Sequence, residues 1–144
     1  MLRLVDVDRY NFSSLIDLSV GKEQDTFIAS NAYSLAQAKV QPECVPFGIY
    51  EGNVPIGFCM YCLDLDDHEY WIYRLMIDKR HQGKGCGREA LWLLIKLLQA
   101  DSEHHVIFLS VEPNNKWAIQ LYESMGFVPD GRMMYGEIVY KLKY

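Results

Sequence analysis

The chain has 144 residues, of which half are apolar and 13% aromatic, so it is too rich in core-forming residues to be disordered. No apolar run approaches the roughly 18 residues of a membrane span. A net charge of -5 argues against a general nucleic-acid binder and is compatible with a cationic substrate. Arg3, Asp6 and Asp8 interrupt the stretch that a signal peptide would need, and we expect one cytoplasmic domain over residues 1–144.

The first half of the chain predicts a strand, two helices and a hairpin. Residues 2–5 alternate weakly as a strand, and a helical pattern follows from about Asp8. A second helix is expected over about 25–40, and Pro42 and Pro46 bracket the loop that ends it. Its packed face would contain Ile28, Ala32, Leu35, Ala36 and Lys39. Residues 47–50 and 54–65, separated by a Glu-Gly-Asn turn, are typical of a β-hairpin.

The second half alternates strands and helices. A strand over 70–78 leads through a basic glycine turn into an amphipathic helix over 89–98, whose inner face carries Leu91, Leu94, Ile95 and Leu98. A β-rich run over 105–111 predicts a strand buried on both faces. The next helix would pack through Ala118, Leu121, Tyr122 and Met125 and end at Gly126. Residues 127–128 and 136–144 supply the last strands.

The order of these elements is β, α, α, β, β, β, α, β, α, β, β. A strand–helix–strand unit between residues 70 and 111 implies a parallel crossover, and the hairpins around it are antiparallel. We therefore predict an α+β fold with a central mixed β-sheet flanked by about four helices.

The four cysteines do not form a recognisable metal site. Cys59 and Cys62 have the spacing of a zinc knuckle, but no second pair of ligands follows at the required distance. In a strand, residues three apart face opposite sides of the sheet. We expect these two thiols, with Cys44 and Cys86, to be buried or free in a reducing compartment, and no metal to be bound.

The turn between residues 80 and 88 has the composition of an anion site. Glycines at 83, 85 and 87 permit tight curvature and close approach of a ligand, and the following helix directs its free N–H groups and positive dipole end into the turn. Arg80, Lys84 and Arg88 add positive charge. Phosphate is the anion that such a turn most naturally binds, although a tight structural turn is the alternative.

Two common phosphate loops do not fit this turn. A P-loop needs Ser or Thr after a lysine that follows its last glycine, whereas Arg88 and Glu89 follow Gly87. The dinucleotide-binding fingerprint needs a different glycine register and the first strand of a doubly wound sheet. Both nucleotide-loop classes are therefore excluded.

What remains, Gln82-x-x-Gly85-x-Gly87 at a strand-to-helix turn, resembles the acetyl-CoA pyrophosphate loop of the GNAT N-acetyltransferase superfamily. The later pattern Asn115-x-x-Ala118-x-x-Leu121-Tyr122-x-x-x-Gly126-Phe127 is similar to the strand–helix module of that superfamily. The acceptor-side segments 27–38 and 71–77 resemble bacterial spermine/spermidine (diamine) N-acetyltransferases. The resemblance implies the GNAT acyl-CoA N-acyltransferase fold and an acetyl-CoA-dependent enzyme of the acyltransferase class.

The resemblance also implies a cofactor site. Backbone groups of Leu75, Met76 and Ile77 would pair with the pantetheine arm of acetyl-CoA as if it were an added strand. The pyrophosphate would be held by the backbone N–H groups of Gln82, Gly83, Lys84, Gly85, Cys86 and Gly87, with Arg88 beside them. Asn115 would either hydrogen-bond the cofactor, cap its helix, or do both.

Acetyl transfer to an amine needs a proton acceptor and a proton donor. Tyr122 suits the donor, because a phenol with a pKa of about 10 is protonated at neutral pH and the superfamily commonly uses this tyrosine as the general acid. The alternative is an ordinary core tyrosine on a packed helix face. Glu69 could lie on one strand face with Trp71 and Tyr73 and bind the substrate with them. The sequence shows no clear direct base, and we expect a chain of waters to take the proton instead.

The predicted acceptor is a small polyamine. Glu23 and Asp25 could bind its cationic tail, and Trp71 and Tyr73 could stack on its ammonium groups. The alternatives are helix N-terminal charges for the two acids and core packing for the two rings. Another amine (an aminoglycoside, an amino acid or a protein N-terminus) or a non-catalytic acyl-CoA-binding module remains possible. A homodimer is also expected by analogy, with the last strand, residues 137–143, as the pairing edge.

Overall fold

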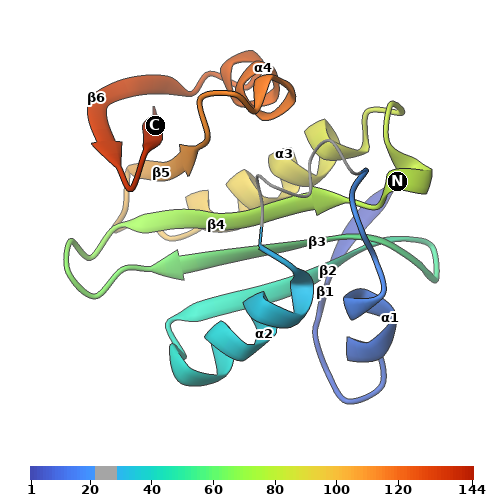
Figure 1. The fold of residues 1–144 in the computed structure, drawn as a ribbon. Helices are drawn as coiled ribbons and strands as arrows, with labels where there is room; N and C mark the ends of the chain where they lie inside the picture. Colours follow the sequence, from blue (N-terminus) through green and yellow to red (C-terminus); the bar gives the residue numbers. More distant parts are fainter. Residues whose placement is uncertain (22–28) are drawn as a thin grey trace.

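The computed structural model describes residues 1–21 and 29–144 and contains one seven-stranded sheet in the order β1-β2-β3-β4-β5-β7-β6 (Figure 1). Its elements are β1 (Leu2–Asp6), α1 (Phe12–Ile16), α2 (Asn31–Val40), β2 (Cys44–Glu51), β3 (Val54–Leu63), β4 (Tyr70–Ile77), α3 (Cys86–Gln99), β5 (Val106–Val111), α4 (Lys116–Ser124), β6 (Val128–Met134) and β7 (Glu137–Lys143). A 3₁₀ turn, η1 (Lys79–His81), follows β4. This order of strands and helices is the predicted one, and the α+β class is confirmed.

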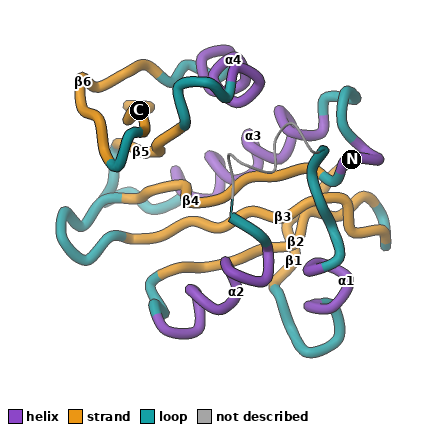
Figure 2. Tube along the Cα trace, viewed as in Figure 1, coloured by secondary structure: helices purple, strands orange, loops and turns teal. Residues whose placement is uncertain are grey.

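Helices cover both faces of the sheet (Figure 2). On one face, α3 and α4 bury the larger apolar core, and the predicted inner face of α3, with Leu91, Leu94 and Leu98, is almost fully buried. On the other face, α1 and α2 pack over a smaller core centred on Leu15, Phe58 and Met60. The prediction that the strand carrying Cys59 and Cys62 directs them to opposite faces is confirmed, because each belongs to a different core.

A β-bulge in β4 changes which side chains face which helices. Met60 of β3 pairs with Arg74, but the next residue, Tyr61, pairs with Ile72, so Tyr73 is an extra residue on β4. Ile72 and Leu75 consequently lie in the α3-side core, although a regular strand would place them on opposite faces. Tyr73 lies on the opposite face of the sheet and packs against the smaller core that α1 and α2 cover.

The same strand separates from its parallel neighbour at the bulge. β4 pairs with β5 only through Tyr70–Ile72, opposite Ile107–Leu109. β5 continues to pair with β7 along its whole length, from Val106 to Val111. From Tyr73 onward, the edge of β4 that faces β5 therefore has no strand partner among the described residues. β4 and β5 diverge from this point, and the opening between them positions the candidate site.

Three details of the predicted elements are wrong. In α2 the buried residues are Asn31 and Ser34, whereas Ala32, Ala36 and Lys39 are exposed. Its buried polar groups are satisfied by α1 and by its own first turn, as Asn31 Nδ2 donates to Leu15 O at 2.8 Å and Ser34 Oγ to Ser30 O at 3.0 Å. In β5 only alternate residues, Ile107, Leu109 and Val111, are fully buried, and the other face is covered only in part, with Phe108 stacked on Trp71.

The last strand also differs from the expectation. β7 is not an edge, because it lies between β5 and β6 and pairs with both. A dimer formed by adding a strand to 137–143 is therefore ruled out by the strand order. The edges of the sheet are β1 and β6.

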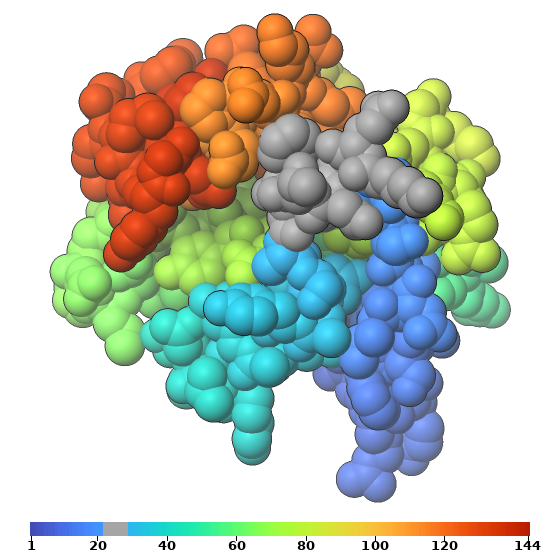
Figure 3. Space-filling model, viewed as in Figure 1, coloured from blue at the N-terminus to red at the C-terminus, as the bar shows by residue number. Residues whose placement is uncertain are grey.

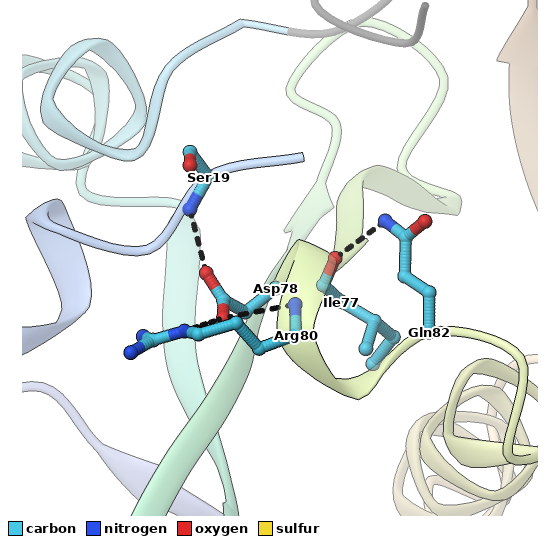
Figure 4. A network of polar contacts seen from close by, with 5 residues as sticks. All are labelled: Ser19, Ile77, Asp78, Arg80 and Gln82. Carbon is cyan, nitrogen blue, oxygen red and sulfur yellow. Dashed lines mark hydrogen bonds and ion pairs between the residues drawn. The ribbon is translucent and has the colours of Figure 1, made fainter. Parts of the chain in front are cut away.

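A buried carboxylate fixes the end of β4 to the N-terminal part of the chain (Figure 4). Asp78 is 1% exposed and accepts hydrogen bonds from Ser19 N at 3.0 Å and Arg80 Nε at 2.7 Å. Burial alone would raise the pKa of Asp78, but the hydrogen bonds from Ser19 and Arg80 outweigh it and hold this pKa below its usual value. The ionised form is therefore the one that stabilises the fold.

Asp78→Asn should lower the free energy of unfolding by about 1–3 kcal/mol at pH 7, because it weakens several hydrogen bonds to a buried acceptor. A depressed folded-state pKa contributes stability that is present above the unfolded pKa and is lost as the pH falls through the folded value. Urea unfolding should therefore show the gap between variant and wild type narrowing below about pH 4. A gap that stays constant from pH 7 to acid would contradict this assignment.

Candidate active site

The opening between β4 and β5 leads into a cavity of about 400 Å³. In the space-filling view, a recess separates the orange and red C-terminal part from the green strands (Figure 3). Its walls come from β4, β5, α4 and the start of β7, and Gln37 of α2 reaches it from the other face of the sheet. The cavity thus extends through the sheet at the point where its two halves separate.

Tyr122 lies in the wall of this cavity. It is 8% exposed, and its ring packs against Phe127 at a centroid distance of 5.9 Å. Burial, and then the nearby charge of Glu137, raise the pKa of Tyr122 to about 12. The phenol therefore stays protonated through the physiological range and can act only as a proton donor there. Tyr122 thus belongs to the packed face of its helix and also borders the cavity.

Asn115 positions the helix that carries Tyr122. Its Oδ1 accepts a hydrogen bond from Ala118 N at 3.3 Å, so the predicted N-cap of α4 is confirmed. Asn115 also lines the cavity. At the other end of the helix, Gly126 has a φ of 100°, the left-handed conformation in which glycine commonly ends helices.

The glycine turn has the geometry of an anion site. Gly83 and Gly85 have φ values of 77° and 81°, and no atom lies within 4 Å of the position that a Cβ would take at either. Gly85 is the N-cap of α3 and has no side chain to accept from the first helical N–H groups. These groups therefore point into open space, which fits the phosphates of a nucleotide-like cofactor.

Gly87, the third glycine, allows two helices to pack closely. Gly87 lies in the first turn of α3, and a Cβ added there would come within 3.2 Å of the Trp117 ring. Its absence lets α4 pack closely on the start of α3. Arg88 strengthens the same contact, because its Nη1 donates to Ser124 Oγ at 2.7 Å.

The charges of the turn are not equivalent. Arg80 was expected to add positive charge, but it forms an ion pair with Asp78 at 2.7 Å that offsets this charge. Gln82 Nε2 donates to Ile77 O at 2.9 Å and so fixes the turn to the end of β4 (Figure 4). Lys84 is exposed. Burial and the charges of Glu51 and Glu89 raise the pKa of the Cys86 thiol, so this residue can contribute its backbone but not a reactive thiolate.

The expected pantetheine strand is well placed. Leu75, Met76 and Ile77 follow the bulge on the unpartnered edge of β4, and Leu75 and Met76 line the cavity. Their side chains are almost fully buried, and they pack alternately on the two faces of the sheet. Their backbone groups on the β5 side are thus the part of each residue that a bound chain could reach.

The predicted acceptor residues are only partly brought together. Trp71 and Tyr73 both line the cavity. The Trp71 ring is already packed, with Phe108 stacked at 5.0 Å and the Arg132 guanidinium at 5.6 Å, and its Nε1 donates to Asp67. Glu69 precedes β4 and is not among the cavity residues. Glu23 and Asp25 lie outside the described residues.

Arg74 is a cavity residue that the sequence patterns did not single out. Its Nη2 donates to Gln37 Oε1 at 2.8 Å and its Nη1 to Tyr73 O at 2.9 Å. Burial lowers the pKa of Arg74 from its usual value. The bulge is the reason that Arg74 faces α2, and nothing in the sequence marks a bulge at this position.

Carboxylates from three separate segments also line the cavity. Asp64 follows β3, Glu112 follows β5, and Glu137 begins β7. Glu137 Oε1 accepts a hydrogen bond from Ser110 Oγ at 2.6 Å. Only the three-dimensional order of the strands brings these residues together, so no local sequence signal could have identified them as a set.

Comparison with known proteins identifies the fold and the chemistry. Residues 12–127 match the acetyltransferase (GNAT) family. The chain belongs to this family. It is therefore an acetyl-CoA-dependent N-acetyltransferase, and the cofactor and fold expected from the two sequence motifs are confirmed.

Among curated proteins, this GNAT enzyme is 35% identical over 129 residues to the spermine/spermidine N(1)-acetyltransferase of Bacillus subtilis strain 168, covering 85% of each chain. It is 26% identical over 127 residues to the L-amino acid N-acyltransferase MnaT of Escherichia coli K12, covering 86% of this chain and 73% of that protein. These two relatives act on different amines by name.

Solved structures share the fold at low identity. The aminoglycoside acetyltransferase AAC(6')-Ib in complex with coenzyme A superposes with a TM-score of 0.83 and 18% identity, covering 99% of this chain and 95% of that one. The PaiA N-acetyltransferase from Thermoplasma acidophilum in complex with coenzyme A superposes with a TM-score of 0.76 and 15% identity, covering 100% of this chain and 99% of that one.

Within residues 1–21 and 29–144, no helix has the length and apolar character to cross a lipid bilayer.

Gly85→Val should weaken coenzyme A binding by at least about tenfold, because a branched side chain is strained at this φ and its methyl groups enter the space in front of the α3 N-terminus. Isothermal titration with coenzyme A gives the dissociation constant. Gly52→Val is the matched control, since Gly52 also has a positive φ of 61° and open space around its Cβ position, but lies in the β2–β3 turn. Equal weakening by both variants would show that backbone strain alone is responsible.

Proposed function

We propose that this GNAT enzyme transfers the acetyl group of acetyl-CoA to a primary amine of a small polyamine resembling spermidine or spermine. The observation that carries the proposal is the charge of the cavity. Among its described residues, three carboxylates face one guanidinium, so the cavity favours a cationic guest. The 35% identity to a spermine/spermidine N(1)-acetyltransferase supports the same substrate class.

The residues that would hold acetyl-CoA divide by the part of the molecule that they meet. Residues 75–77 would pair with its pantetheine arm along the open edge of β4. The N–H groups at the start of α3, with those of the glycine turn and Arg88, would hold its pyrophosphate. When bound, acetyl-CoA supplies a thioester carbonyl as the electrophile and a thiolate as the leaving group.

The acceptor amine must lose its charge before it can react. An alkylammonium group in water has a pKa of about 10.4, some 3.4 units above pH 7, so its neutralisation costs roughly 4.6 kcal/mol. Desolvation in the cavity lowers this cost, because burial disfavours a charged amine, whereas the carboxylates that attract the polyamine raise it, so a group that accepts the proton is needed. Tyr122 would protonate the departing sulfur, the step for which its high pKa suits it.

Direct attack of the amine on the thioester fits the cysteines better than an acetyl-cysteine intermediate does. Burial raises the pKa of Cys44 and Cys59 to about 12 and also raises that of Cys62 and Cys86. A nucleophilic cysteine would need the opposite shift. The reaction would therefore proceed in a ternary complex of enzyme, acetyl-CoA and amine.

Arg74 favours a second candidate, an amino acid acceptor. A guanidinium in the cavity can bind a carboxylate, and one relative is named as an L-amino acid N-acyltransferase. Arg74 is, however, already engaged by Gln37 and by the Tyr73 carbonyl, and the carboxylates outnumber it. We therefore place the polyamine first.

Thiol release from acetyl-CoA should be fastest with spermidine or spermine in a panel that also contains an aminoglycoside, L-amino acids and a peptide with a free N-terminus. The physical reason is the attraction between a polycation and the carboxylate-lined cavity. Activity that is confined to L-amino acids would reject the polyamine and support the role of Arg74 as a carboxylate clamp.

Tyr122→Phe should lower kcat by roughly 10²-fold and leave the dissociation constant of coenzyme A unchanged, because it removes one hydroxyl from a buried ring. Since the pKa of Tyr122 is about 12, wild-type kcat should not fall through ionisation of this residue up to about pH 10. Steady-state kinetics with the best amine of the panel measures both. An unchanged kcat would remove Tyr122 from the mechanism.

A further inference from the structure

The proposed reaction also needs a group that accepts the proton of the incoming amine. The sequence showed no clear direct base and favoured a chain of waters, and Glu69, the acid nearest the start of β4, is not among the cavity residues. We propose that the carboxylate of Glu137 receives the reacting ammonium group and takes its proton. This inference rests on the proposed amine acetylation in this cavity, but not on which amine is the acceptor.

Glu137 is held in place from two directions. It is the first residue of β7, where Val111 of β5 pairs with the neighbouring Ile138. Its Oε1 accepts the hydrogen bond from Ser110 Oγ at 2.6 Å. The side chain is half-buried and lines the cavity beyond the point where β4 leaves β5. The carboxylate therefore has a defined position beside the place where the two substrates would meet.

Tyr122 and Arg74 both lie within electrostatic range of Glu137. Its charge raises the pKa of Tyr122 on α4 and opposes the lowering of the pKa of Arg74 on β4. It thus lies within electrostatic range of both the proton donor and the fixed cation. The other carboxylates of the described cavity wall, Asp64 and Glu112, are not among the groups that perturb Tyr122.

The other two carboxylates of the cavity are less suited than Glu137 to accept the proton of the amine. Asp64 lies in the turn after β3, and its Oδ1 accepts the backbone N–H of Asp66 at 2.6 Å. Glu112 follows β5 in the segment that leads to the cap of α4. We assign to them the general attraction of a cationic substrate, and to Glu137 the proton transfer.

In water a carboxylate is too weak a base to deprotonate an ammonium ion, but burial in the cavity makes this proton transfer more favourable. Proton transfer turns two charged groups into two neutral ones, which burial favours over a desolvated ion pair. Arg74 repels the ammonium but also stabilises the Glu137 carboxylate, so its two effects on the proton transfer oppose each other. A bound acetyl-CoA would fill the open side of the cavity and exclude water, which strengthens the effect of burial.

The proton balance of the proposed reaction is complete. One ammonium proton moves to Glu137 and later leaves to solvent. The nitrogen lone pair then forms the N–C bond at the acetyl carbonyl, and the C–S bond breaks. Tyr122 donates its proton to the departing sulfur, and the second proton of the nitrogen restores the phenol. The products are the acetylated amine, coenzyme A and one released proton.

Glu137→Gln tests the assignment, because it keeps an acceptor for Ser110 and the size of the side chain but removes the basic charge. We expect kcat/KM to fall by roughly 10²-fold for any strongly basic amine that the enzyme accepts, monoamine or polyamine. With a fluorinated amine that is already neutral at the assay pH, the loss should shrink to within about threefold, since no proton has to be removed. Coenzyme A affinity, measured by titration, should not change and reports that the variant is folded.

The controls separate this role from others. Glu103→Gln, an exposed carboxylate outside the cavity, should match wild type with both amines. An equal loss with the basic and the neutral amine, or no loss with either, would overturn the assignment of Glu137. Rejection of polyamines in favour of another amine would disprove only the proposed substrate, because the same comparison is then made with the accepted amine. A wild-type enzyme without turnover on any amine would overturn both.

Discussion

The site of this enzyme depends on one irregularity of the sheet, the extra residue in β4. A regular β4 would continue to pair with β5 and would close the centre of the sheet. The bulge at Tyr73 bends the strand, and pairing with β5 stops at Ile72. One unpaired strand edge and one cavity result from this single change, and an edge with free backbone groups is what an extended pantetheine chain can complete.

The charges of the protein fit the division that we propose between the two substrates. The N-terminus of α3, free of a capping side chain, presents positive potential to the pyrophosphate side. The acceptor cavity carries most of its charge as carboxylates, in keeping with the overall charge of -5. A basic residue near the glycine turn need not be a phosphate ligand. Arg80 forms an ion pair with Asp78, and the Asp78 carboxylate also accepts a hydrogen bond from Ser19 that holds the N-terminal segment against β4.

Local patterns predicted what depends on local physics. The helical spacing of Leu91, Leu94 and Leu98, the cap at Asn115 and the glycine turn could be read from the sequence, because each depends on neighbours within one or two turns. Some cavity residues, such as Trp71 and Tyr122, were also predicted, but Arg74 and Glu137 were not. Glu137 reaches the site only because β7 inserts between β5 and β6, and Arg74 only because the bulge shifts the alternation of β4. The helix α2 was misjudged for a related reason, since its buried face is polar and is satisfied by contacts with α1 and with its own first turn.

We propose that coenzyme A binds along the unpartnered edge of β4 and at the start of α3. Amide hydrogen exchange with and without coenzyme A tests this most directly, because it reports on individual backbone N–H groups. We expect slower exchange on binding in residues 74–77 and 83–88, with little change in β1 and β2 on the far side of the sheet. Protection that is absent from both of these segments, or that appears mainly at β1 and β2, would contradict the proposed site.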